Sequence, residues 1–162
     1  MNAGEALLDL ARAGGGTSLF VVGTGKNAGK TVAMRAIAHA AVRRELKVGL
    51  TSAGRDGELF DAVDSLAKPR LFLESGTIVA TARALLPPRV DYEMLEETPW
   101  QTAAGPVVFA RVGSPAFYEL AGPPRASELR LCVHRLYELG CEQVIVDGAI
   151  DRVAALAGGN DS

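Results

Sequence analysis

Leu-Phe-Val-Val-Gly-Thr-Gly-Lys-Asn-Ala-Gly-Lys-Thr, from Leu19 to Thr31, is the stretch that decides the fold of this chain. It begins with a short apolar run, continues as a glycine-rich loop, and ends where a helical pattern starts. A strand, a glycine-rich loop and a helix in this order are typical of a phosphate-binding loop, the P-loop or Walker A motif. Glycine lets backbone N–H groups approach phosphates closely, and the N-terminus of the helix adds partial positive charge.

Each position of the loop has an expected role in binding a nucleotide. We expect Lys30 to reach the β- and γ-phosphates and so to act in catalysis, and the hydroxyl of Thr31 to hold Mg²⁺. The usual spacing requires glycine at position 24, where this chain has Thr24 between two glycines. An ordinary glycine-rich turn before a helix is therefore the alternative. The expected nucleotide-binding residues are Gly23, Thr24, Gly25, Lys26, Asn27, Ala28, Gly29, Lys30 and Thr31.

The loop also resembles the loops of known nucleotide-binding families. The pattern Gly23-Thr24-x-x-x-x-Gly29-Lys30-Thr31 is similar to that of dethiobiotin synthetase and related amidoligases. The run from Lys26 to Thr31 resembles the loop of the molybdopterin-guanine dinucleotide biosynthesis adaptor. Both families belong to the SIMIBI class of P-loop NTPases. The resemblance implies nucleotide hydrolysis, or phosphorylation of a small carboxylate or alcohol.

Composition limits the classes of protein to which the chain can belong. Its 162 residues suit a single domain, 1–162, with residues 157–162 expected to form a flexible tail. The formal net charge of −2 shows no basic excess, so we expect neither nucleic acid nor a membrane as partner. Met1–Ala13 has neither a basic start nor the apolar core of a signal peptide, and no run of 18 apolar residues occurs, so we expect neither a signal peptide nor a membrane span. Cys132 and Cys141 lack a metal-ligand pattern and are expected to be buried, reduced thiols, which fits a cytoplasmic protein.

Apolar runs that alternate with helical patterns predict an α/β fold. We expect a three-layer sandwich with a mostly parallel sheet, that is, the P-loop NTPase fold in full or shortened form. Strands beginning at Leu19, Val48, Val107 and Val144 should be central. Tyr92–Thr98 fits either a helix or a strand. The remaining predicted elements are a strand at Arg70–Leu73, an antiparallel return at Phe117–Leu120, and helices at Ala3–Ala13, Lys30–Leu46, Leu59–Ala67, Ser75–Leu86 and Ser127–Leu139.

Carboxylates at two predicted strand ends are further candidates for the site. The apolar run Val144–Val146 ends in Asp147-Gly148, which matches a Walker B strand, so Asp147 is expected to bind Mg²⁺ or its water. The loop after the second strand carries Asp56, which is expected either to bind Mg²⁺ or to orient a nucleophile as a catalytic residue. A surface turn with solvated charges is the alternative for that loop. Arg111 is expected either in the ligand crevice or paired with an acid.

Two functional hypotheses follow from these motifs. The first is Mg²⁺-dependent binding of ATP, or of another NTP, with hydrolysis or phosphoryl transfer. The second is a slow or non-hydrolysing accessory or reactivating protein for a partner enzyme, because Gly49–Glu58 and Val146–Arg152 also resemble accessory proteins of cobalamin-dependent aminomutases. The sequence lacks the Asn-Lys-x-Asp guanine signature. An open sheet edge is expected, covered by a homodimer or by the partner enzyme, and a purely structural α/β protein is a third alternative.

Overall fold

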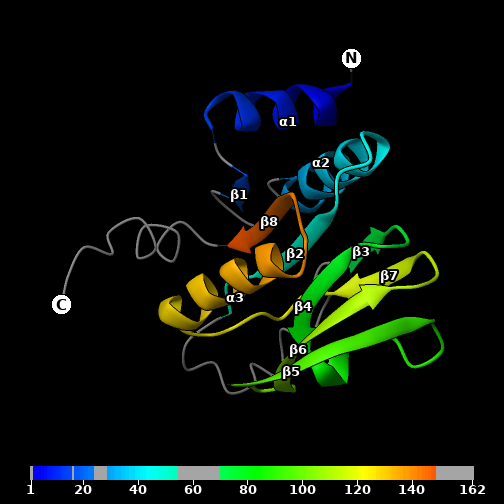
Figure 1. The fold of residues 1–162 in the computed structure, drawn as a ribbon, viewed down its shortest axis with the longest axis vertical. Helices are drawn as coiled ribbons and strands as arrows, with labels where there is room; N and C mark the ends of the chain where they lie inside the picture. The colour runs from blue at the N-terminus through cyan, green and yellow to red at the C-terminus, as the bar shows by residue number, and fades with distance from the viewer. Residues whose placement is uncertain (1, 16, 24–28, 55–69, 149–162) are drawn as a thin grey trace.

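A six-stranded mixed sheet lies at the centre of the computed structural model, which describes residues 2–15, 17–23, 29–54 and 70–148 (Figure 1). Its strands are β1 (Ser18–Val22), β2 (Val48–Ser52), β4 (Ile78–Ala82), β5 (Tyr92–Thr102), β6 (Gly105–Val112) and β8 (Gln143–Gly148). The order across the sheet is β1-β8-β2-β4-β6-β5. The first four strands in this order run parallel, and β6 and β5 complete the sheet by antiparallel pairing. The predicted mostly parallel α/β sheet is therefore confirmed.

The inner parallel strands are buried along their whole length. Every residue of β2, β4 and β8 is buried. These strands are short apolar runs rich in Val and Ile, as expected for strands that are covered on both faces. Continuous burial makes the parallel part of the sheet a rigid platform for whatever lies at its ends.

Two hydrophobic cores show which elements cover each face of the sheet. The helices are α1 (Ala3–Ala13), α2 (Lys30–Arg43) and α3 (Ala126–Glu138). One core joins α2 and Leu8 of α1 to one face of the sheet, and the other core joins α3 to the opposite face. A small antiparallel sheet of β3 (Arg70–Leu73) and β7 (Ala116–Glu119) shares the core of α2. The chain thus forms three layers, and none of its described helices is long and apolar enough to cross a membrane.

Helix α1 packs closely on α2. Its N-terminus is closed by a capping box, in which the side chains of Asn2 and Glu5 each accept a hydrogen bond from the other residue's backbone N–H. Gly4 provides the closest approach, because a Cβ atom there would lie 2.3 Å from the carbonyl oxygen of Ala36. Glycine is therefore required at this helix crossing.

One predicted helix is wrong. Ser75–Leu86 was expected to be helical, but the structure contains a turn at Gly76, then strand β4, then a short 3-10 helix, Arg83–Leu85. The backbone of Gly76 has φ of 88°, which ends any helical pattern at this point. The β-branched residues at positions 77–79 and 81 favour a strand, and burial between β2 and β6 overrides the helical spacing.

Two predictions about strand pairing are also wrong. The return strand after Val112 does not form a hairpin with β6, because β7 pairs instead with β3 in the small sheet. The strand at Leu19 was expected to be central, but β1 is the end strand of the described sheet. Strand β8, the last in sequence, lies between β1 and β2, and no local periodicity encodes such an insertion.

The other elements of the described chain agree with prediction within a few residues. The helices at the N-terminus, after the loop and at 126–138 are present, and Tyr92–Thr98 is part of strand β5. The predicted helix Leu59–Ala67 and the expected tail 157–162 lie outside the described residues.

The close helix contact predicts a position-specific loss of stability. Gly4→Ala should lower the free energy of unfolding by about 1–3 kcal/mol, because the new methyl group must displace the backbone of α2. Gly14→Ala is the matched control, since a Cβ atom at Gly14 would lie 3.6 Å from the nearest atom it meets, the Ala11 carbonyl oxygen. Urea unfolding followed by circular dichroism measures the free energy of unfolding of both variants. Equal midpoints for the two variants would contradict the described packing of α1 on α2.

Candidate active site

Three parallel strands bring their carboxyl ends together at one edge of the sheet. The register places Val21 beside Asp147 and Val22 beside Gly148, and Asp147 lies beside Ser52 on the other side. The backbone N–H of Ala53 donates to the carbonyl of Asp147 over 2.7 Å. In open α/β sheets ligands bind at this edge. The register therefore places the predicted Walker B residue between the ends of β1 and β2.

Helix α2 begins at the same edge. Gly29 precedes it in a left-handed conformation, with φ 74° and ψ 11°, which glycine adopts without strain. Among the described residues, no side chain caps the first N–H groups of α2, and the first turn of the helix contains no acidic residue. Uncapped N–H groups and the helix dipole favour an anion at this position.

The first residue of α2 contacts the end of β8 directly. The Nζ atom of Lys30 lies 2.7 Å from Oδ1 of Asp147, whose side chain is only 10% exposed. That oxygen makes no aligned hydrogen bond to any described residue, so the ammonium group of Lys30 is its polar partner in the described part of the chain. A buried carboxylate without a charged partner is costly. Lys30 therefore neutralises a charge that would otherwise be isolated near the carboxyl end of β8.

The residues described here fit a hydrated Mg²⁺ ion that also contacts phosphate. Thr31 is half-buried and follows Lys30, and no described residue hydrogen-bonds to its hydroxyl. Within the described ranges, no group of three or more His, Cys, Asp or Glu residues could hold a metal. Mg²⁺ usually keeps several waters and takes one or two carboxylates together with substrate phosphates. Asp147 and Thr31 are suited to such a site, and an all-protein metal cage is not present among the described residues.

A backbone crossing beside β2 was not predicted as part of the site. The N–H of Gly122 donates to Oγ of Ser52, and the N–H of Gly54 donates to the carbonyl of Pro123, each over 2.9 Å. A Cβ atom at Gly122 would lie 1.9 Å from the carbonyl oxygen of Ser52. In the sequence this segment is Gly122-Pro123-Pro124, a conformationally restricted connection. In the structure, this connection fixes the path of the chain as it leaves β2 beside Asp147.

The structure describes five of the predicted site residues. Lys30 and Asp147 form the ion pair, Thr31 and Gly29 flank the start of α2, and Gly23 follows β1. The structure therefore brings Lys30 and the carboxylate of Asp147, which the sequence singled out from separate motifs, into contact. The predicted residues outside the described ranges are Thr24, Gly25, Lys26, Asn27, Ala28 and Asp56.

Other candidate side chains lie away from this edge. Arg111 pairs with Glu93 over 2.5 Å and lies beside Ile78, at the amino end of β4, so the alternative of pairing with an acid is correct. Cys132 and Cys141 are free and buried, as predicted. Burial raises the pKa of the Cys132 thiol to about 12 and that of Cys141 to about 11. Neither thiol has the lowered pKa of a nucleophilic cysteine.

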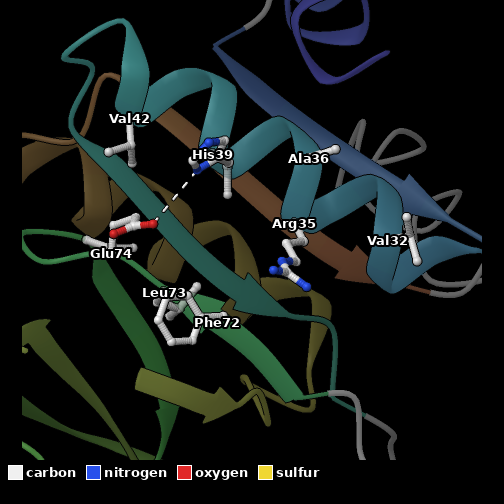
Figure 2. A pocket seen from close by; sticks show the side chains of 10 residues that line it. Val32, Arg35, Ala36, His39, Val42, Phe72, Leu73 and Glu74 are labelled. Carbon is white, nitrogen blue, oxygen red and sulfur yellow. Dashed lines mark ion pairs between the residues drawn. The ribbon is translucent and has the colours of Figure 1, made fainter. Parts of the chain in front are cut away.

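An open groove of about 410 Å³ lies elsewhere, between α2 and β3 (Figure 2). Its walls include Arg35, His39 and Phe72, and His39 lies 3.8 Å from Glu74 across it. Neither Lys30 nor Asp147 lines it. The groove is thus separate from the candidate site, and His39 is an exposed surface histidine.

Comparison of this chain with protein-family models, with curated proteins and with solved structures gave no match.

Proposed function

We propose that this chain is a P-loop nucleotide-binding protein that takes a nucleoside triphosphate with Mg²⁺ at the carboxyl edge of its sheet. The single observation that carries the proposal is the contact between Lys30 and Asp147. The contact supports the P-loop interpretation of the sequence, because two separate motifs predicted that Lys30 serves the phosphates and that Asp147 serves the metal. Within the proposal, Lys30 leaves Asp147 when phosphates arrive and neutralises their charge instead.

ATP is the proposed nucleotide, and hydrolysis or phosphoryl transfer is the proposed reaction. The sequence contains only three asparagines, Asn2, Asn27 and Asn160, so it has no guanine-reading Asn-Lys-x-Asp segment. Phosphoryl transfer needs positioning and charge neutralisation more than covalent catalysis. Mg²⁺, when bound, supplies neutralisation of the phosphate charge. Asp147 and Thr31 would hold the ion, Lys30 and the first N–H groups of α2 would hold the phosphates, and Asp56 would orient the nucleophile.

A slow, accessory role for a partner enzyme is the second candidate. One observation favours the accessory role. Asp147 is the only carboxylate identified in the described part of the site, and in the proposal this carboxylate serves the metal. A hydrolytic enzyme also needs a group that positions water or another nucleophile. Binding with turnover by the chain alone supports the enzyme. Binding without turnover, restored by a partner, supports the accessory role.

The P-loop proposal predicts a strong effect of removing the ammonium group of Lys30. Lys30→Ala should weaken ATP binding at least about a hundredfold, since it removes a charge-assisted contact to phosphate. Lys26→Ala should weaken binding less. Arg35→Ala is the matched control, because it removes a cation from the exposed side of the same helix, in the groove of Figure 2. Isothermal titration calorimetry measures the ATP affinity of all three variants. Equal ATP affinity for Lys30→Ala and Arg35→Ala would exclude the P-loop assignment.

If Asp147 serves the metal, a substitution at the end of β8 should change the Mg²⁺ dependence of nucleotide binding without abolishing binding itself. Asp147→Asn keeps the side-chain shape but removes the charge, so nucleotide binding should persist without metal and no longer tighten when Mg²⁺ is added. Asp56→Asn should affect binding less and any turnover more. Asp9→Asn is a control that removes an exposed carboxylate paired with Arg44, far from the strand ends. If Asp147→Asn retains the full Mg²⁺ dependence, Asp147 does not serve the metal.

A further inference from the structure

Ser52 ends strand β2 directly beside Asp147. The two residues are partners in the parallel register of β2 and β8. Their Cα atoms are therefore about 4.8 Å apart, the usual spacing of neighbouring strands. Both residues are buried, with 7% of Ser52 and 8% of Asp147 exposed. The sheet thus holds a buried hydroxyl next to the carboxylate of the candidate site.

The hydrophobic cores show that the side chains of Ser52 and Asp147 point to the same face of the sheet. Leu50 and Ile145 both belong to the core that α2 covers. Side chains alternate along a strand, so Ser52 and Asp147, each two residues further on, lie on that face as well. Lys30, which opens α2, contacts Asp147 from this side. The hydroxyl, the carboxylate and the ammonium group therefore share one face.

The hydroxyl of Ser52 is held in place but keeps a free donor. Its Oγ accepts a hydrogen bond from the backbone N–H of Gly122 over 2.9 Å. A serine hydroxyl can donate one hydrogen bond while it accepts another. In the parts of the chain that the structure describes, the O–H of Ser52 has no acceptor. Its proton is therefore available for a bond to a neighbouring group.

Asp147 needs such a donor when Lys30 moves. Lys30 is the charged partner of this carboxylate within the described ranges, and the proposed function takes Lys30 away to the phosphates. A buried carboxylate that loses its partner is unfavourable unless another donor replaces it. We propose that Ser52 is a positioning residue, whose hydroxyl donates to Asp147 when Lys30 leaves and so holds the carboxylate in place. Its part in nucleotide binding rests on the proposed function, whereas its ability to replace Lys30 does not.

The first test needs no nucleotide. A double-mutant cycle combines Ser52→Ala with Lys30→Met, which removes the ammonium group and keeps an unbranched side chain, and urea unfolding of the full chain measures stability. Ser52→Ala also deprives the Gly122 N–H of its acceptor, but that loss is common to both backgrounds and cancels in the cycle. The unfolding equilibrium constant of the double variant should be about tenfold larger than the two single effects predict together, as expected for one hydrogen bond to a charged group.

Thr51→Val is the matched control for Ser52→Ala. Thr51 is also buried and precedes Ser52 on β2, but its hydroxyl donates to the carbonyl of Ala80 and lies against Sγ of Cys132, on the face that α3 covers. The effects of Thr51→Val and Lys30→Met should therefore be additive. If the cycle with Ser52→Ala is equally additive, the hydroxyl does not replace Lys30 and the proposal is overturned.

The second test keeps Lys30, so it does not depend on how well Lys30→Met folds. Calorimetry compares the affinities of the wild type, Ser52→Ala and Thr51→Val for a non-hydrolysable ATP analogue with Mg²⁺. Ser52→Ala should bind about tenfold more weakly, because Asp147 loses Lys30 and gains no donor, and Thr51→Val should bind like the wild type. Equal affinity of Ser52→Ala and the wild type overturns the proposal. If the wild type does not bind the analogue, the proposed function fails, while the first test still decides whether Ser52 can replace Lys30.

Discussion

The ion pair of Lys30 with Asp147 depends on where β8 enters the sheet. Because β8 lies between β1 and β2, its last residues stand next to the end of the strand that leads into the loop. Helix α2 starts at the same edge, so its first side chain reaches the carboxylate. Moving β8 one place along the sheet would separate the two charges by about 5 Å and leave Asp147 buried without this partner.

The surroundings of the pair are fixed mostly by backbone contacts. The carbonyl of Asp147 accepts from Ala53, and Gly122 and Gly54 allow the Gly-Pro-Pro connection to cross the end of β2 at close range. Lys30, in contrast, has a long side chain that can change partner. The combination places a fixed carboxylate beside a movable cation, which suits a site whose charge balance changes when phosphate and metal bind.

Much of the fold was predictable from local patterns. Strand β1, helix α2, helix α3 and strand β8 all follow apolar periodicity and the glycine-rich loop, and these elements carry Lys30 and Asp147. Strand β4 was missed because the spacing of alanines and leucines along Ser75–Leu86 also fits a helix, and burial between two strands decided the outcome. The edge position of β1 and the pairing of β7 with β3 depend on contacts between distant residues, which periodicity does not encode.

The most direct test of the central claim is a crystal structure of the chain with Mg²⁺ and a non-hydrolysable ATP analogue. We expect Nζ of Lys30 to leave Asp147 and to contact the β- or γ-phosphate in that complex. We also expect the ion to lie between the Thr31 hydroxyl and Asp147, either directly or through water. A nucleotide bound elsewhere, with the 2.7 Å contact between Lys30 and Asp147 unchanged, would contradict the account.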